Sequence, residues 1–188
     1  MAVFKSNIRK PLKLPDLSFA GKREIKNIWE TKMRGKVLIV DDYSDWRNML
    51  SGLIEREGHL VEAAGNWEAA LAYIDENKEL DLVILDIRLV ETEENNEDGM
   101  RLLAEIRRRL AFTRVIMVTG YGTMETQRKA FKDFQAFDFF RKAQFDSDEF
   151  RRSVQDAVEQ TIRDRKTWKD KEFIRDHHYE VWQRDRAD

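Results

Sequence analysis

Five polar side chains stand at the ends of short apolar runs, and their chemistry suits the binding and transfer of a phosphoryl group. These residues are Asp41, Asp42, Asp86, Thr119 and Lys142. Three neighbouring carboxylates repel one another and need a cation, and oxygen ligation with room for water suits Mg²⁺, or Mn²⁺ as its substitute. One carboxylate could then attack a phosphoryl group, while the ammonium and the hydroxyl neutralise and bind its oxygens. This chemistry requires that the five side chains meet.

The elements between these residues can bring them together. Five short apolar runs have strand character, and stretches with helical spacing separate them; the runs are 37–40, 59–63, 82–85, 115–118 and 137–140. Strands that alternate with helices predict a parallel sheet with helices on both faces, a doubly wound α/β sandwich. The carboxyl ends of such strands share one edge, where ligands bind. Four of the five strands deliver the polar residues to that edge.

Taken singly, each of these residues has a plainer explanation. An Asp after a strand is usually a helix N-cap or a turn residue, a Thr there is more often a cap, and a lone Lys is normally a solvated charge. Chance, however, would scatter such residues over both ends of the strands. Their placement at the same end of four strands therefore favours a shared site.

The composition excludes several other classes of protein. The chain has 188 residues, 41% hydrophobic and 37% charged, which is enough apolar material for one domain with additional segments. It has no cysteine, so disulfides, thiol catalysis and Cys-ligated zinc are excluded. No apolar run approaches the roughly 18 to 20 residues of a membrane-spanning helix, and the start lacks the apolar region of a secretory signal. We therefore expect a soluble, cytoplasmic protein.

Charge divides the chain unevenly. The first 36 residues hold ten Lys and Arg against three Asp and Glu, whereas the remainder is acidic. A basic arm over residues 1–35 could contact an acidic partner, or it could be a solvated segment, which is the commoner case. No helix-turn-helix signal supports nucleic-acid binding. The tail over residues 163–188 is charged but rich in aromatic residues, so we expect it to extend the last helix or to fold back on the domain.

The segment from about residue 36 to residue 160 resembles the receiver domain of bacterial two-component response regulators, and we place that domain at 36–162. The resemblance rests on five motifs, namely Val37–Asp42, Leu82–Asp86, Asp98-Gly99 followed by Leu102-Leu103, Val118–Gly122 and Asp138–Lys142. It implies a flavodoxin-like sheet of five strands in the order 2-1-3-4-5. The basic N-terminal arm and a C-terminal helical extension would be additions to that fold.

The resemblance also implies a role for each site residue. Asp86 is the expected phosphoacceptor, and Thr119 and Lys142 are expected to bind the phosphoryl group. The expected protein ligands of Mg²⁺ are Asp41, Asp42, Asp86 and the backbone carbonyl of Arg88.

Three further positions follow from the same resemblance. Phe139 falls where the family has an aromatic switch side chain that turns inward when the threonine closes on the phosphate. Arg88 and Tyr121 stand two residues beyond Asp86 and Thr119, where the family tunes the lifetime of the phosphoryl group. Both are bulky enough to hinder an attacking water, so we expect slow self-dephosphorylation.

The chain departs from the family pattern in several places. Ala143 follows the lysine where the family usually has a proline in cis linkage, so we expect a trans peptide and an altered loop. The loop 91–98 is longer than usual and holds five acidic residues, which could perturb metal affinity, contact a partner or simply be solvated. Gln135 stands where the family usually has a glycine, so the turn there is expected to differ.

Trp46 could line the site entrance, although packing on its helix face fits its spacing better.

We expect a phosphorylation-dependent signalling switch and not a metabolic enzyme. The phosphoryl donor would be a sensor histidine kinase or a phosphotransfer protein, and the output a contact with a downstream protein target, with a homodimer as a further option. The alternative is a phosphorylation-independent adaptor of the same fold, against which the complete set of site residues argues. A phosphatase or phosphotransferase of similar topology would need an acid or base two residues beyond Asp86, where Arg88 stands.

Overall fold

A computed structural model of the chain describes residues 33–89, 98–120 and 123–184, with the side chains of the last helix up to residue 175. The chain divides into two units, and all the described residues belong to the unit Met33–Asp188. Nearly all of the basic arm, the acidic loop from 91 to 97 and Tyr121 lie outside the described residues, so the expectations about them stay predictions.

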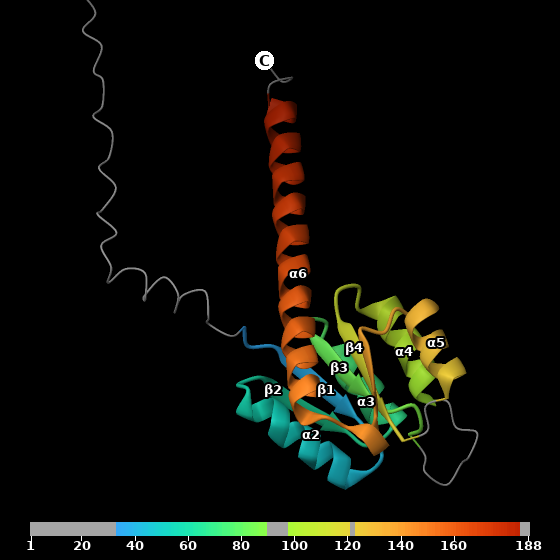
Figure 1. The fold of residues 1–188 in the computed structure, drawn as a ribbon. Helices are drawn as coiled ribbons and strands as arrows, with labels where there is room; N and C mark the ends of the chain where they lie inside the picture. The colour runs from blue at the N-terminus through green and yellow to red at the C-terminus, as the bar shows by residue number, and fades with distance from the viewer. Residues whose placement is uncertain (1–32, 90–97, 121–122, 185–188) are drawn as a thin grey trace, which may run out of the picture. The chain divides into compact units, whose positions relative to one another are not determined.

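Five parallel strands form one sheet in the order β2-β1-β3-β4-β5, which confirms the predicted doubly wound fold (Figure 1). The strands are β1 (Lys36–Val40), β2 (Leu60–Ala64), β3 (Leu82–Leu85), β4 (Arg114–Thr119) and β5 (Asp138–Arg141). The central strands β1, β3 and β4 are buried over nearly their whole length because helices cover both of their faces. Strand β2 lies at an edge and is mostly exposed, which explains its weaker apolar signal in the sequence.

Helices cover both faces of the sheet. On one face lie α3 (Trp67–Glu76), α4 (Asp98–Arg109) and α5 (Met124–Lys132), and on the other lie α2 (Ser44–Arg56) and α6 (Ser147–Arg184). A short 3₁₀ helix, η1 (Lys142–Gln144), follows β5. Neighbouring residues of a strand therefore belong to different cores, as Leu38 and Ile39 of β1 do.

The turn before β5 contains a residue in an unusual backbone conformation. Gln135 has a φ of 53°, in the left-handed region that favours glycine. Arg107 of α4 holds this turn, because its Nε donates to the Phe134 carbonyl at 2.8 Å and a second guanidinium nitrogen donates to the Gln135 carbonyl. The Ala136 N–H donates to the Ala130 carbonyl at 2.9 Å. The absence of glycine therefore does not prevent a left-handed turn at this position.

Helix α6 runs without a break from Ser147 to Arg184, so the tail extends the last helix and does not fold back (Figure 1). Its side chains past residue 162 still contact the domain. These contacts include the ion pairs of Asp164 with Arg114 (2.6 Å), Arg165 with Asp81 (2.9 Å) and Lys169 with Glu79 (3.1 Å), and the rings of Trp168 and Phe112 (centroids 5.8 Å apart). The expected domain boundary after residue 162 thus falls inside a helix whose contacts with the domain continue. Among the described residues, no helix has both the length and the apolarity to cross a membrane.

Candidate functional site

The parallel register of β1 and β3 brings the three carboxylates together. Val40 and Leu85 are paired residues at the ends of these strands, and the Asp86 N–H donates to the Val40 carbonyl at 2.9 Å. Asp41, Asp42 and Asp86 follow at once, and an oxygen from each lies within 4.8 Å of the others. The predicted convergence of Asp41, Asp42 and Asp86 is therefore present at the carboxyl edge of the sheet.

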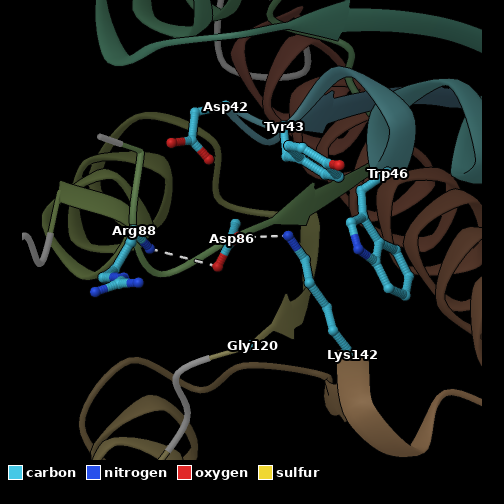
Figure 2. Close-up of a pocket in the computed structure, with 7 residues that line it drawn as sticks. All are labelled: Asp42, Tyr43, Trp46, Asp86, Arg88, Gly120 and Lys142. Atoms are coloured by element: carbon cyan, nitrogen blue, oxygen red, sulfur yellow. Dashed lines mark hydrogen bonds and ion pairs between the residues drawn. The ribbon is translucent and has the colours of Figure 1, made fainter. Parts of the chain in front are cut away.

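Lys142 reaches into this cluster from the end of β5. Its ammonium lies 2.6 Å from Asp86 Oδ2 (Figure 2) and 2.7 Å from Asp41 Oδ2. The peptide bonds of the described residues are all trans, as was expected for the one that joins Lys142 to Ala143. The loop, with its trans peptide, therefore delivers the ammonium to the carboxylates.

The charges of this cluster are strongly coupled. Burial raises the pKa of Asp41, and the neighbouring Asp86 carboxylate raises it further, against the opposing effect of the Lys142 ammonium. Burial alone would lower the pKa of Lys142, but the charge of Asp86 and the hydrogen bonds to both carboxylates outweigh it, so the net pKa shift is upward. The lysine is therefore held in its charged form.

The donor set fits a divalent metal ion. Asp41 and Asp86 are almost fully buried, whereas Asp42 is partly exposed and lines a pocket. Three carboxylates against one ammonium leave the cluster with an excess of negative charge, which a divalent cation would neutralise. The ligands are all oxygens, and the open side of the cluster leaves room for water, as Mg²⁺ prefers. The side chains of Asp41, Asp42 and Asp86 would hold the ion.

The cluster opens into a pocket of about 390 Å³. Its lining residues are Asp42, Tyr43, Trp46, Asp86, Arg88, Gly120 and Lys142 (Figure 2). Both expected roles of Trp46 are present, because its ring lines the pocket and also packs on the core beside Phe145. Tyr43 was missed in the sequence; its position directly after the acidic pair is the only signal that could have indicated it.

Arg88 lies on the side of Asp86 opposite to Lys142 (Figure 2). Its N–H donates to Asp86 Oδ1 at 3.4 Å, which holds the carboxylate from the backbone side. The side chain of Arg88 is mostly buried and lines the pocket, so it restricts the space beside Asp86. Its role as a metal ligand through the backbone carbonyl stays a prediction.

The predicted hydroxyl and the predicted switch residue are both buried. Thr119 is fully buried at the end of β4, and the adjacent Gly120 lines the pocket. Phe139 is 9% exposed and packs against Phe131 of α5, with ring centroids 6.5 Å apart. Its side chain therefore points inward, towards the core shared by α3, α4 and α5.

The fold and the site together define a class of protein. A family model of the response regulator receiver domain matches residues 37–155. The chain therefore belongs to the family of response regulator receiver domains, which are components of two-component signalling systems.

Individual relatives refine this picture. Over 106 residues the chain is 39% identical to an NtrX-like response regulator of Rickettsia bellii, a match that covers 56% of this chain and 21% of that protein. Over 122 residues it is 32% identical to sporulation initiation phosphotransferase F of Bacillus subtilis, covering 65% of this chain and 92% of that one. The chain thus spans about a fifth of the length of the NtrX-like regulators that it matches.

Solved structures show the same fold. The receiver domain of NtrX from Brucella abortus superimposes with a TM-score of 0.57 at 33% identity, covering 65% of this chain and 98% of that one. A CheY-like receiver domain from Methanospirillum hungatei gives a TM-score of 0.61 at 25% identity and covers 70% of this chain and 99% of its own. The similarity therefore extends over entire receiver domains.

Proposed function

We propose that this chain is a cytoplasmic, phosphorylation-dependent signalling switch whose phosphoacceptor is Asp86. The donor would be the phosphohistidine of a sensor histidine kinase or of a phosphotransfer protein. The observation that carries the proposal is the position of the Lys142 ammonium, within 2.7 Å of both Asp41 and Asp86 in a cluster that also holds Asp42. This arrangement offers a nucleophile, a cation site and a fixed positive charge at the mouth of one pocket.

The transfer needs positioning more than covalent assistance. An oxygen of Asp86 forms the bond to phosphorus while the phosphorus–nitrogen bond of the donor breaks, and the donor departs as neutral imidazole when its other nitrogen carries a proton. Bound Mg²⁺ would neutralise charge on the transferred oxygens. Lys142 exchanges its contact with the Asp86 carboxylate for a phosphoryl oxygen, and the Thr119 hydroxyl would donate to another.

The signal would be read from a change in packing. Movement of Thr119 towards the phosphoryl group would change the packing of β4 against β5, which carries the buried Phe139 that packs on Phe131 of α5. The surface around α5, β5 and α6 would then present a different shape to a downstream protein target. In this proposal the chain catalyses only its own phosphorylation and dephosphorylation, so we do not class it with metabolic enzymes. The name of the Bacillus subtilis relative, a phosphotransferase, supports group transfer at such a site.

Intact-mass spectrometry tests the proposal directly. The wild type, Asp86→Asn and Asp75→Asn are treated with acetyl phosphate and Mg²⁺; Asp75 is an exposed carboxylate of α3 and serves as the control. The expected result is a gain of one phosphoryl group in the wild type and in Asp75→Asn, but not in Asp86→Asn. An unmodified wild type, under conditions that label another receiver domain, would overturn the proposal in favour of a phosphorylation-independent adaptor.

A further inference from the structure

We infer that Trp46 is a positioning residue for Lys142, and that Phe145 holds Trp46 in place. The inference rests on the proposed function, because it assigns a residue to the site at which Asp86 would be phosphorylated. The Lys142 ammonium lies 5.3 Å from the centroid of the Trp46 ring, within the range of a cation–π interaction. The same ring lines the pocket (Figure 2).

The indole limits where the ammonium can go. Lysine is a flexible side chain with three rotatable donors, and its contacts with Asp41 and Asp86 must be exchanged when a phosphoryl group arrives. A cation on the face of an aromatic ring keeps its attraction to that ring while its other contacts change. Trp46 therefore keeps the ammonium beside Asp86 during the exchange, instead of allowing it to swing into water.

The ring of Trp46 is itself anchored in the core. It meets Phe145 edge to face, with centroids 5.3 Å apart and an interplanar angle of 82°. Phe145 lies directly after η1 and packs on two buried rings, Phe150 at 5.1 Å and Phe140 at 6.1 Å. Edge-to-face pairs of this kind add stabilisation beyond the burial of area. The start of α2 and the loop that carries Lys142 are thus joined by one aromatic cluster.

Binding of beryllium trifluoride in the presence of Mg²⁺ measures this role, because the anion stands in for the phosphoryl group. Affinity is followed by ¹⁹F NMR, and the rate of modification by acetyl phosphate is followed by intact mass. Trp46→Ala and Trp46→Leu are expected to bind the anion roughly three- to tenfold more weakly than the wild type. Trp46→Phe restores most of the affinity because it retains an aromatic face, and Phe145→Leu weakens binding although Phe145 does not line the pocket.

Two controls separate positioning from a general loss of structure. Trp67→Ala removes a tryptophan that makes a comparable contact with Arg101, at 5.6 Å, away from the pocket, and it should leave binding unchanged. In a Lys142→Ala background, Trp46→Ala should cause no further loss, because the indole acts through the lysine. Each variant is compared at a temperature at which circular dichroism shows it folded.

The outcomes distinguish the two proposals. If the wild type neither binds beryllium trifluoride nor reacts with acetyl phosphate, the proposed function fails. If the wild type does both but Trp46→Leu binds as tightly as Trp46→Phe, the aromatic face is not needed and the inference about Trp46 fails. It fails equally if Trp46→Ala weakens binding as much without Lys142 as with it.

Discussion

Gly99 touches the backbone of Asp86, the proposed phosphoacceptor. A Cβ atom on Gly99 would lie 1.9 Å from the main-chain oxygen of Asp86, and the Gly99 N–H donates to the Ile87 carbonyl at 2.9 Å. The first turn of α4 therefore packs directly against the strand end that carries the site. Only a residue without a side chain permits this approach.

Substitution of Gly99 should therefore disturb both stability and the site. Gly99→Ala forces α4 away from Asp86, and we expect a loss of about 1–3 kcal/mol in the free energy of unfolding together with weaker binding of beryllium trifluoride. Urea denaturation and ¹⁹F NMR measure the two effects. Gly52→Ala is the matched control, because the added methyl group meets nothing within 4 Å in the middle of α2. That variant should be stabilised by about 0.5–1 kcal/mol. A Gly99→Ala protein with wild-type stability would contradict the argument.

Lys142 would compete with the proposed metal ion for the same carboxylate oxygens. Its ammonium occupies positions 2.6 Å and 2.7 Å from Asp86 and Asp41. Lys142→Met should therefore raise the affinity for Mg²⁺ roughly tenfold, as removal of one nearby positive charge implies, while it lowers the affinity for beryllium trifluoride. Isothermal titration calorimetry with Mg²⁺ checks the first effect. Lys169→Met removes an exposed lysine paired with Glu79 and should change neither affinity. Weaker Mg²⁺ binding by Lys142→Met would contradict the expectation.

The buried Asp41 makes stability depend on pH. Its pKa is raised above the ordinary value of 3.8, so the folded protein binds this proton more tightly than the unfolded chain does. Ionising Asp41 in the folded protein therefore lowers the free energy of unfolding. This loss is absent at a pH below 3.8, grows as the pH rises towards the raised pKa, and is constant above it. Asp41→Asn removes this loss and should raise the Tm of the metal-free protein at neutral pH but not at acid pH. Thermal melts in the presence of a chelator measure the Tm at both pH values. A lower Tm of Asp41→Asn at neutral pH would contradict the explanation.

Asp81 connects α6 to the start of β1, at the amino ends of the strands and therefore away from the site. Its carboxylate accepts from the Lys36 N–H at 2.8 Å and lies 2.9 Å from the Arg165 guanidinium, with only 6% of the side chain exposed. Asp81→Asn should cost about 2–3 kcal/mol of unfolding free energy, because it removes the carboxylate paired with the mostly buried Arg165. Glu79→Gln breaks an exposed pair with Lys169 and should cost less than about 1 kcal/mol. The affinity for beryllium trifluoride should be unchanged in both variants. Loss of binding in Asp81→Asn would contradict this expectation and show that the amino and carboxyl ends of the strands are coupled.

The sequence could predict those features that depend on local pattern and on the rules of parallel sheets. The strands were found within about a residue of their ends because apolar runs buried on both faces interrupt helical spacing, and the convergence of Asp41, Asp42 and Asp86 followed from the shared carboxyl edge. The weakest strand signal belonged to β2, whose position at the sheet edge leaves it exposed. These features need only the order of residues along the chain and the geometry of a βαβ unit.

The walls of the pocket depended on contacts between distant segments. Helical spacing places Trp46 on the inner face of α2, but only the packing of α2 against the loop after β5 sets its ring over Lys142 and against Phe145. The closeness of Gly99 to Asp86 likewise depends on the depth at which α4 packs. The sequence by itself therefore determined the sheet and the convergence of the acidic residues, since both follow from periodicity and strand direction. Only the tertiary structure decided what surrounds those residues, because such contacts arise from side-chain packing between segments that the order of residues does not relate.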